Sequence, residues 1–316
     1  MTKEKTVYLE YLDEFKSYGI PKSEIEALRR NGVVADIRFH KELYEKRQAS
    51  RPTVGFLLGQ DKGTDGTEYY TVGLTYAHSI LNSGAKIRFL DYDNAYCQMK
   101  KCDGAILPGG AFDNPESFFI DGKDMGGREG KRFFAYKSVI QEAFRHHKPM
   151  LGICAGAQMI GAVLGNMKMY RSLEQEIPRK TVHKPRTETD IRLHGLKLLP
   201  GTPIFDIMGL RPDEDRIMIN SRHSQAMVHP ALQEYVKGEP LVKMDMYAVS
   251  DADGVPEIWG NASAGILCIQ GHPEDLAAAG DEKMLRVYRH IARLLAEYKK
   301  AGNGCRERRK KHLNAD

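Results

Sequence analysis

KPMLGICAGAQMIGAVLGN, residues 148–166, is the stretch from which the fold can be worked out. Residues 149–153 predict a short buried strand, and residues 155–164 carry apolar side chains at helical spacing. Cys154 lies between these two segments and is flanked by small residues, so the chain can reverse where a Cβ would clash. The pattern predicts a strand, a sharp turn and a helix that ends at Gly165-Asn166.

Cys154 is therefore expected between a strand end and a helix N-terminus. The helix dipole and the free N–H groups at such a position favour a thiolate and can also hold an oxyanion. A buried core cysteine in a glycine-rich turn is the alternative, and this stretch alone does not separate the two.

Strand-like and helix-like segments alternate along the chain from residue 53. The expected strands are 53–58, 86–90, 104–107 and 150–153, and the expected helices are 69–83 and 133–146. This order predicts an α/β fold with a doubly wound, mainly parallel sheet flanked by helices. Later strand candidates, expected to add antiparallel hairpins, are 216–220, 247–250, 256–259 and 265–270. Ligands in such sheets gather at the carboxyl ends of the strands, where residues 108–110 and Cys154 both lie.

Charge and composition divide the chain into three parts. Residues 1–50 are a charged extension with a helix expected at 21–30 and a strand at 33–39. Residues 51–298 form the main domain and end in an expected helix at 281–298. The remainder, 299–316, is a basic tail expected to be disordered. It carries a net charge of +5 (+6 for residues 299–311 and −1 for Asp316), the same as the whole chain, so the body is neutral.

Composition excludes several classes of protein. No apolar run approaches the ~18 residues of a membrane span, and acidic residues interrupt the N-terminus, so no secretory signal is predicted. The five cysteines contain no CxxC pair, which argues against a disulfide framework or a zinc site and favours a reducing, cytoplasmic location. No cofactor or metal site is predicted, and the neutral body does not favour nucleic acid as a partner.

A nucleophilic thiol needs a base, and the base needs a carboxylate to orient it. His272 follows the strand expected at 265–270, and Glu274 comes two residues later. In an extended segment both side chains would point to the same side, so the carboxylate could reach the ring. A histidine after a strand is more often structural, so this prediction depends on its combination with Cys154.

Two motifs carry a resemblance to a known family. Residues 152–158 (GICAGAQ) and 270–274 (QGHPE) closely resemble the nucleophile and base signatures of class I glutamine amidotransferases, and residues 108–110 (PGG) resemble their oxyanion segment. Within that superfamily the sequence is most similar to the γ-glutamyl-γ-aminobutyrate hydrolase-like group, peptidase family C26. Weaker matches in the family's order are 70–85, 148–149, 164–166 with Tyr170, 220–225 and 253–257.

The resemblance implies a role for each matching residue. Cys154 would be the nucleophile, His272 the general base and then acid, and Glu274 the group that orients His272. The backbone N–H groups of Gly110 and Ala155 would hold the oxyanion. The residues implied to contact substrate are Gly109, Gln158, Ser221, Arg222 and His223.

Structural roles are the alternative for several of these positions. Gln158 is also explained as a polar residue on a first helical turn, and His223 as a loop histidine that caps or packs. Asp253-Gly254 is expected to be a hairpin turn, and Glu257 a solvated strand residue.

The resemblance implies a free-standing hydrolase that cleaves a γ-glutamyl amide of a small molecule through a γ-glutamyl thioester. The alternatives are a glutaminase component that passes ammonia to a separate synthetase, and a non-enzymatic binding protein on a retired fold. A homo-oligomer is compatible with each. The sequence departs from the family's pattern at Ala155, where arginine is usual, and at Gly271, where an aromatic is usual, so the leaving amine stays open.

Overall fold

The computed structural model of the chain describes residues 50–62, 68–110, 114–120, 130–177, 183, 192–232 and 239–313. They fall into two compact units. Residues 50–51, 60–62 and 68–71 belong to one unit, and residues 52–59 and 72–313 with the gaps given belong to the other. The helix and strand expected at 21–30 and 33–39 lie outside the described residues, and the predicted domain boundaries stay predictions.

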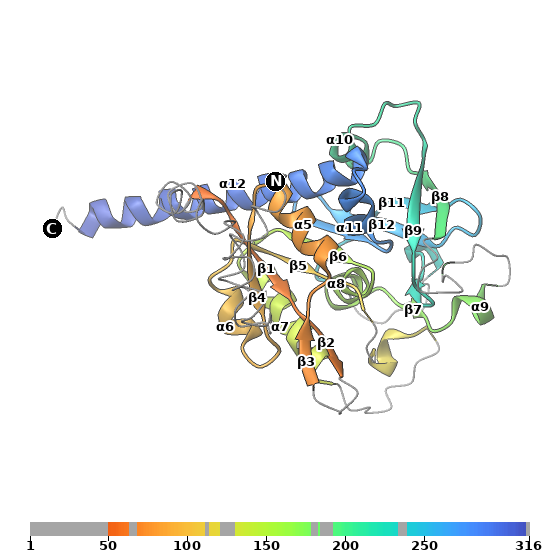
Figure 1. The fold of residues 1–316 in the computed structure, drawn as a ribbon, viewed down its shortest axis with the longest axis horizontal. Coiled ribbons are helices and arrows are strands. Elements are labelled where there is room, and N and C mark those ends of the chain that lie inside the picture. Colours follow the sequence, from red (N-terminus) through yellow and green to blue (C-terminus); the bar gives the residue numbers. More distant parts are fainter. Residues whose placement is uncertain are drawn as a thin grey trace, which may run out of the picture. The chain divides into compact units, whose positions relative to one another are not determined.

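A mixed nine-stranded sheet forms the centre of the larger unit, in the order β4-β1-β5-β6-β13-β12-β11-β8-β9 (Figure 1). Its first five strands are parallel to one another. They are β4 (Lys86–Leu90), β1 (Thr53–Leu57), β5 (Gly104–Leu107), β6 (Met150–Ile153) and β13 (Ile266–Ile269). The doubly wound, mainly parallel sheet predicted from the sequence is therefore confirmed.

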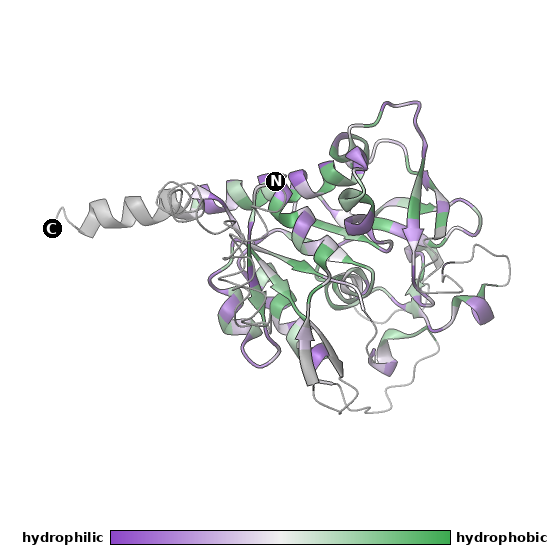
Figure 2. Cartoon of the chain, in the orientation of Figure 1, coloured by the Kyte–Doolittle hydropathy of each residue, from purple (hydrophilic) through white to green (hydrophobic). Residues whose placement is uncertain are grey.

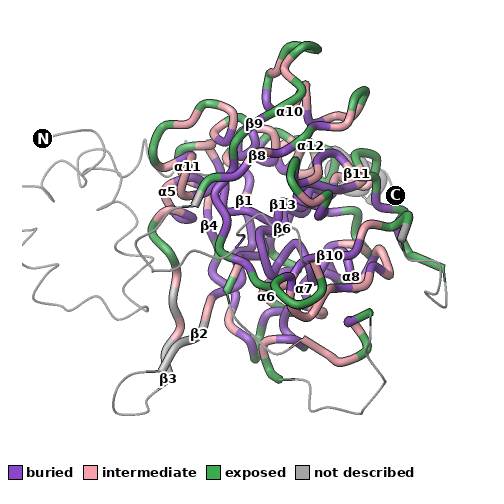
Figure 3. Tube along the Cα trace, turned by 90° about the vertical axis from the view of Figure 1, so that its right-hand side faces the viewer, coloured by how far each residue is buried: buried purple, intermediate pink, exposed green. Residues whose placement is uncertain are grey.

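Helices cover both faces of the parallel strands. On one side α5 (Leu74–Asn82) packs against α11 (Pro273–Ala278) and α12 (Glu282–Leu313). On the other, α7 (Lys131–Arg145) packs between α6 (Ala95–Met99) and α8 (Ala155–Gly165). The strands between these layers are hydrophobic and buried, as expected of a sheet covered on both faces (Figures 2 and 3).

The other half of the sheet is antiparallel. It consists of β12 (Pro256–Asn261), β11 (Asp245–Ser250), β8 (Arg192–Leu198) and β9 (Arg216–Ser221). The sequence analysis did not predict β8. Its inward face carries His194 beside Leu196 and Leu198, and its outward face includes the exposed Leu193, so polarity does not alternate cleanly along it.

Smaller elements complete the description. They are β2 (Gly59–Lys62) paired with β3 (Glu68–Thr71), β7 (Met169–Tyr170) paired with β10 (Ala226–Met227), α9 (Leu173–Glu176), α10 (Ile204–Met208) and two short 3-10 turns at Glu116–Phe118 and Pro230–Leu232. The helix expected at 69–83 begins only at Leu74, because β3 occupies its first residues. In the described part of the chain, no helix combines the length and the apolar character that crossing a membrane requires.

The last helix is longer than expected. α12 buries Met284, Val287, Tyr288, Ile291 and Leu295 along one face, as the helical spacing predicts. It continues past the expected end at residue 298 and reaches Leu313. The structure describes a helix up to residue 313, and the disorder expected for residues 299–316 stays a prediction.

Candidate active site

Cys154 occupies a sharp turn between β6 and α8. Its φ of 50° and ψ of −113° place a non-glycine residue in an unfavourable backbone region. Both neighbouring glycines are required by space: a Cβ on Gly156 would lie 2.0 Å from the carbonyl oxygen of Leu107, and one on Gly152 would lie 2.7 Å from Cα of Ala157. The strand, turn and helix predicted from this stretch are confirmed, and α8 ends at Asn166 in the left-handed conformation.

His272 and Glu274 meet at the start of α11. Nδ1 of His272 lies 2.7 Å from Oε1 of Glu274, and both side chains are buried. The sequence analysis expected an extended segment to bring the carboxylate to the ring, and that reason was wrong. His272 is the residue before the helix, Pro273 is its first residue, and Glu274 in the first turn directs its carboxylate back to the ring.

Cys154 and His272 approach one another because β6 and β13 are neighbouring parallel strands. Their register pairs Gly152 with Cys268 and Ile153 with Ile269, so the residues that follow both strands emerge at the same sheet edge. The side chains of Cys154 and His272 line the same cavity. Burial lowers the pKa of His272, but the charge of Glu274 and the contact with Cys154 outweigh it and raise this pKa well above its usual value.

Gly109, after β5, closes this arrangement from a third strand. A Cβ on Gly109 would lie 3.0 Å from both Cβ of Cys154 and Cε1 of His272, so only glycine fits without displacing a neighbour. The backbone N–H of Gly109 donates to the hydroxyl of Tyr76 at 3.1 Å, and its carbonyl accepts from Arg132 at 3.0 Å. Gly109 is therefore held by these two side chains, neither of which the sequence analysis identified as part of the site.

A cavity of about 440 Å³ opens beside Cys154 and His272. The residues that line it are Gly110, Asn114, Cys154, Ala155, Gln158, Arg222, His223, Ser224, Gln225 and His272. The structure thus brings most of the predicted site residues around one space. Gly109 and Ser221 are not among the lining residues: Ser221 is fully buried, and its hydroxyl donates to the carbonyl of His183.

Polar side chains in the cavity wall are held by hydrogen bonds. Nε2 of Gln158 donates to the carbonyl of Gln225 at 2.9 Å and to Oε1 of Gln270 at 3.1 Å. The guanidinium of Arg222 pairs with Asp275 at 3.1 Å, which anchors it next to the start of α11. Asn114 donates to Oε1 of Gln225 at 3.1 Å. Their partners lie in distant segments, so no local sequence signal indicated them.

Glu257 is not the solvated strand residue expected from the sequence. It is fully buried, since β12 lies inside the sheet between β11 and β13. The turn predicted at Asp253-Gly254 is confirmed: Gly254 has a φ of 74° and its N–H donates to the carbonyl of Ser250. His223 lines the cavity, and its Nε2 lies 3.4 Å from Oε1 of Glu257.

Comparisons with known proteins address the family and the fold. The sequence model of the Peptidase C26 family matches residues 59–274. Protein NtpR of Enterococcus hirae is 28% identical over 91 residues, which are 28% of this chain and 36% of NtpR, so the match spans about a third of that relative's length.

Two solved structures match much of the chain at low sequence identity. A putative GMP synthase protein of Thermoplasma acidophilum is 16% identical, with a TM-score of 0.50 over 80% of this chain and 98% of that one. A glutamine amidotransferase of Thermotoga maritima is 13% identical, with a TM-score of 0.46 over 78% and 98%. At 16% identity, the likeness to the Thermoplasma acidophilum protein shows that the two chains share a fold.

Proposed function

Because the chain belongs to the Peptidase C26 family, we propose that it is a cysteine hydrolase that cleaves the γ-glutamyl amide bond of a small molecule. The observation that carries this proposal is that Cys154 and His272 adjoin at one cavity, with Glu274 hydrogen-bonded to the ring of His272. This arrangement has the parts that nucleophilic catalysis needs: a nucleophile, a base within reach, and a buried carboxylate that orients the base.

The tautomer of His272 follows from its partner. A carboxylate accepts hydrogen bonds, so Nδ1 carries a hydrogen toward Glu274 and Nε2 is left to take the proton of Cys154. The sulfur then attacks the γ-carbonyl carbon and forms a C–S bond. The backbone N–H groups of Gly110 and Ala155, which both line the cavity, would hold the resulting oxyanion.

Collapse of this tetrahedral species breaks the C–N bond. His272 gives its proton to the leaving amine, and a γ-glutamyl thioester remains on Cys154. Water then attacks the thioester while His272 takes one of its protons, and the C–S bond breaks to release glutamate. The proton returns from His272 to the sulfur, so the free enzyme is restored.

The cavity wall offers groups for the α-amino and α-carboxylate end of such a substrate. Arg222 carries the positive charge that a carboxylate requires, and Asn114, Gln158 and Gln225 supply neutral amides. Gly109 and Ser221 would act through their neighbours, since neither lines the cavity.

Mass spectrometry of the purified chain tests the proposal. After exposure to a panel of γ-glutamyl amides, Cys154 is expected to gain the mass of one γ-glutamyl group, and glutamate is expected in solution. Cys154→Ser should abolish both, and Cys97→Ser, which changes an exposed cysteine, should abolish neither. A folded chain that forms no adduct and releases no glutamate from any member of the panel contradicts the proposal.

A glutaminase component that serves a separate synthetase remains the alternative. In that case the isolated chain would be inactive, and ammonia would be released from glutamine only after lysate is added. Cytoplasmic location and homo-oligomer formation also stay predictions, which cell fractionation and light scattering of the purified chain would address.

A further inference from the structure

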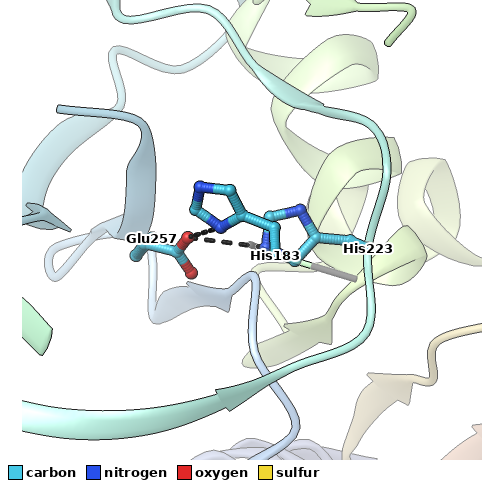
Figure 4. Close-up of side chains that lie close together, drawn as sticks. All are labelled: His183, His223 and Glu257. Carbon is cyan, nitrogen blue, oxygen red and sulfur yellow. Dashed lines mark ion pairs between the residues drawn. The ribbon is translucent and has the colours of Figure 1, made fainter. Parts of the chain in front are cut away.

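Three histidines surround the buried carboxylate of Glu257, and Figure 4 shows two of them, His183 and His223. Glu257 comes from β12, His194 from β8, and His223 from the segment after β9. His183 approaches from a fourth segment. Glu257 is fully buried and the histidines are 4–7% exposed. The proposed reaction gives the cluster as a whole no role, although the resemblance implies a substrate contact for His223.

The distances within the cluster resemble those between ligands of one metal ion. Oε1 of Glu257 lies 3.2 Å from Nε2 of His194, 3.3 Å from Nδ1 of His183 and 3.4 Å from Nε2 of His223. Two ligands that each lie ~2.0–2.1 Å from a tetrahedral zinc ion are separated by roughly 3.4 Å. The donor atoms of His183, His223 and Glu257 all lie within 4.8 Å of one another.

The outer nitrogens of two of the rings determine what faces Glu257. Nε2 of His183 lies 2.9 Å from the carboxylate of Asp253, and Nδ1 of His223 lies 3.0 Å from the carbonyl of Gln225. Both partners are acceptors, so each of these nitrogens must donate. When both rings are neutral, their lone pairs face the carboxylate of Glu257, and a cation between these groups would bind all three. Metal-binding histidines are typically oriented by such a second hydrogen bond.

The charge of the cluster supports the same conclusion. Within the described residues, the only basic groups that pair with Glu257 are these histidines, and its Oε2 has no hydrogen-bond partner. A buried carboxylate needs a compensating positive charge, which either a proton on one of these rings or a bound metal ion can supply. We propose that the cluster binds a divalent transition-metal ion, with zinc as the reference ion, through Nδ1 of His183, Nε2 of His223 and the carboxylate of Glu257.

His194 would support this site through its contact with Glu257, and Asp253 would orient His183. The ion would have a structural role, since it would join the segment of His183 to the segment that ends in the cavity wall. That connection already exists in the backbone, because the N–H of His223 donates to the carbonyl of His183 at 3.1 Å. The competing occupant is a proton on His183, whose pKa rises to about 9 because its hydrogen bonds to Asp253 and Glu257 outweigh the effect of burial.

Competition between the full chain and a chromophoric chelator for zinc tests the proposal. The chain is first stripped of metal and carries Cys154→Ser and His272→Ala, so that the thiol and the group of His272, Glu274 and Asp275 cannot account for binding. One equivalent of zinc per chain is expected. Glu257→Gln should weaken binding more than about 100-fold, and Asp253→Asn by about 10–100-fold. His146→Ala changes a half-exposed histidine in another region and should leave zinc binding unchanged.

Cobalt bound to the Cys154→Ser, His272→Ala chain provides a second, spectroscopic readout. Visible absorption of a four- or five-coordinate ion without a thiolate charge-transfer band supports the cluster. A thiolate band overturns the proposal, and so does zinc binding that Glu257→Gln leaves unchanged. A folded chain that takes up neither ion also overturns it, and a proton is then the occupant of the cluster. Because the readouts are metal affinity and absorption, failure here leaves the proposed hydrolase intact, and an inactive chain that binds zinc leaves this inference intact.

Discussion

Nδ1 of His272 lies 2.7 Å from Oε1 of Glu274, although only one residue separates them and that residue begins a helix. Pro273 suits this position because its fixed φ matches a helix and its missing N–H is not needed there. The helix start turns the carboxylate back onto the preceding ring, so a five-residue motif contains both the base and its orienting group. The nucleophile comes from a different strand.

Replacing Glu274 by glutamine should reduce kcat on a γ-glutamyl amide by about 10²–10⁴, the range for loss of an oriented base. Glutamine keeps the size of the side chain but removes the charge that raises the pKa of His272. The measurement is steady-state kinetics across pH. The limb of the pH–rate profile that is assigned to His272 should also move to lower pH. Glu282→Gln, on the exposed start of α12, is the control, and a Glu274→Gln enzyme with unchanged kcat would contradict the assigned role.

The cysteines should differ in reactivity. Burial raises the pKa of Cys102 to about 12 and raises that of Cys268 even further, so both remain protonated and unreactive near neutral pH. Cys154 lines the cavity and has an imidazole partner, so iodoacetamide should label it in preference to those two. Peptide mapping after brief alkylation measures this order, and His272→Ala should slow labelling of Cys154. Equal labelling of Cys154 and Cys268 in the folded chain would count against it.

Alanine at Gly109 should separate the nucleophile from its base. The added methyl group would meet both Cys154 and His272 at 3.0 Å, and a displacement of the order of 1 Å can cost about 10²-fold in rate. We expect kcat to fall by at least that factor while the far-UV circular dichroism spectrum is retained. Gly130→Ala is the matched control, because nothing lies within 4 Å of a Cβ there. Full activity of Gly109→Ala would show that catalysis does not need the close approach of Gly109 to Cys154 and His272.

Loss of the Arg222 side chain should weaken substrate binding more than chemistry. A charge-assisted hydrogen bond contributes about 1.5–3 kcal/mol, so Arg222→Ala should raise KM by about 10–150-fold with little change in kcat. Arg216→Ala removes an arginine that pairs with Asp251 on another part of the sheet, and should leave KM unchanged. A fall in kcat at constant KM would instead place Arg222 in the chemical step.

Local spacing was sufficient to predict the strand, turn and helix around Cys154, because Gly152 and Gly156 permit approaches that other residues would block. Local sequence was also sufficient to predict the parallel strands, because their apolar residues must be covered on both faces of the sheet. β8 escaped prediction because its inward face includes a histidine, and α11 because a six-residue helix that begins at proline resembles an extended link.

The sequence by itself determined the alternation of strands and helices and the position of a cysteine at a strand end, because both depend on neighbouring residues. Only the tertiary structure decided that Glu257 is buried among histidines and that Tyr76 and Arg132 hold Gly109 in place. These contacts join segments far apart in the chain, and strand order and register, which bring such segments together, are set by packing of the whole sheet.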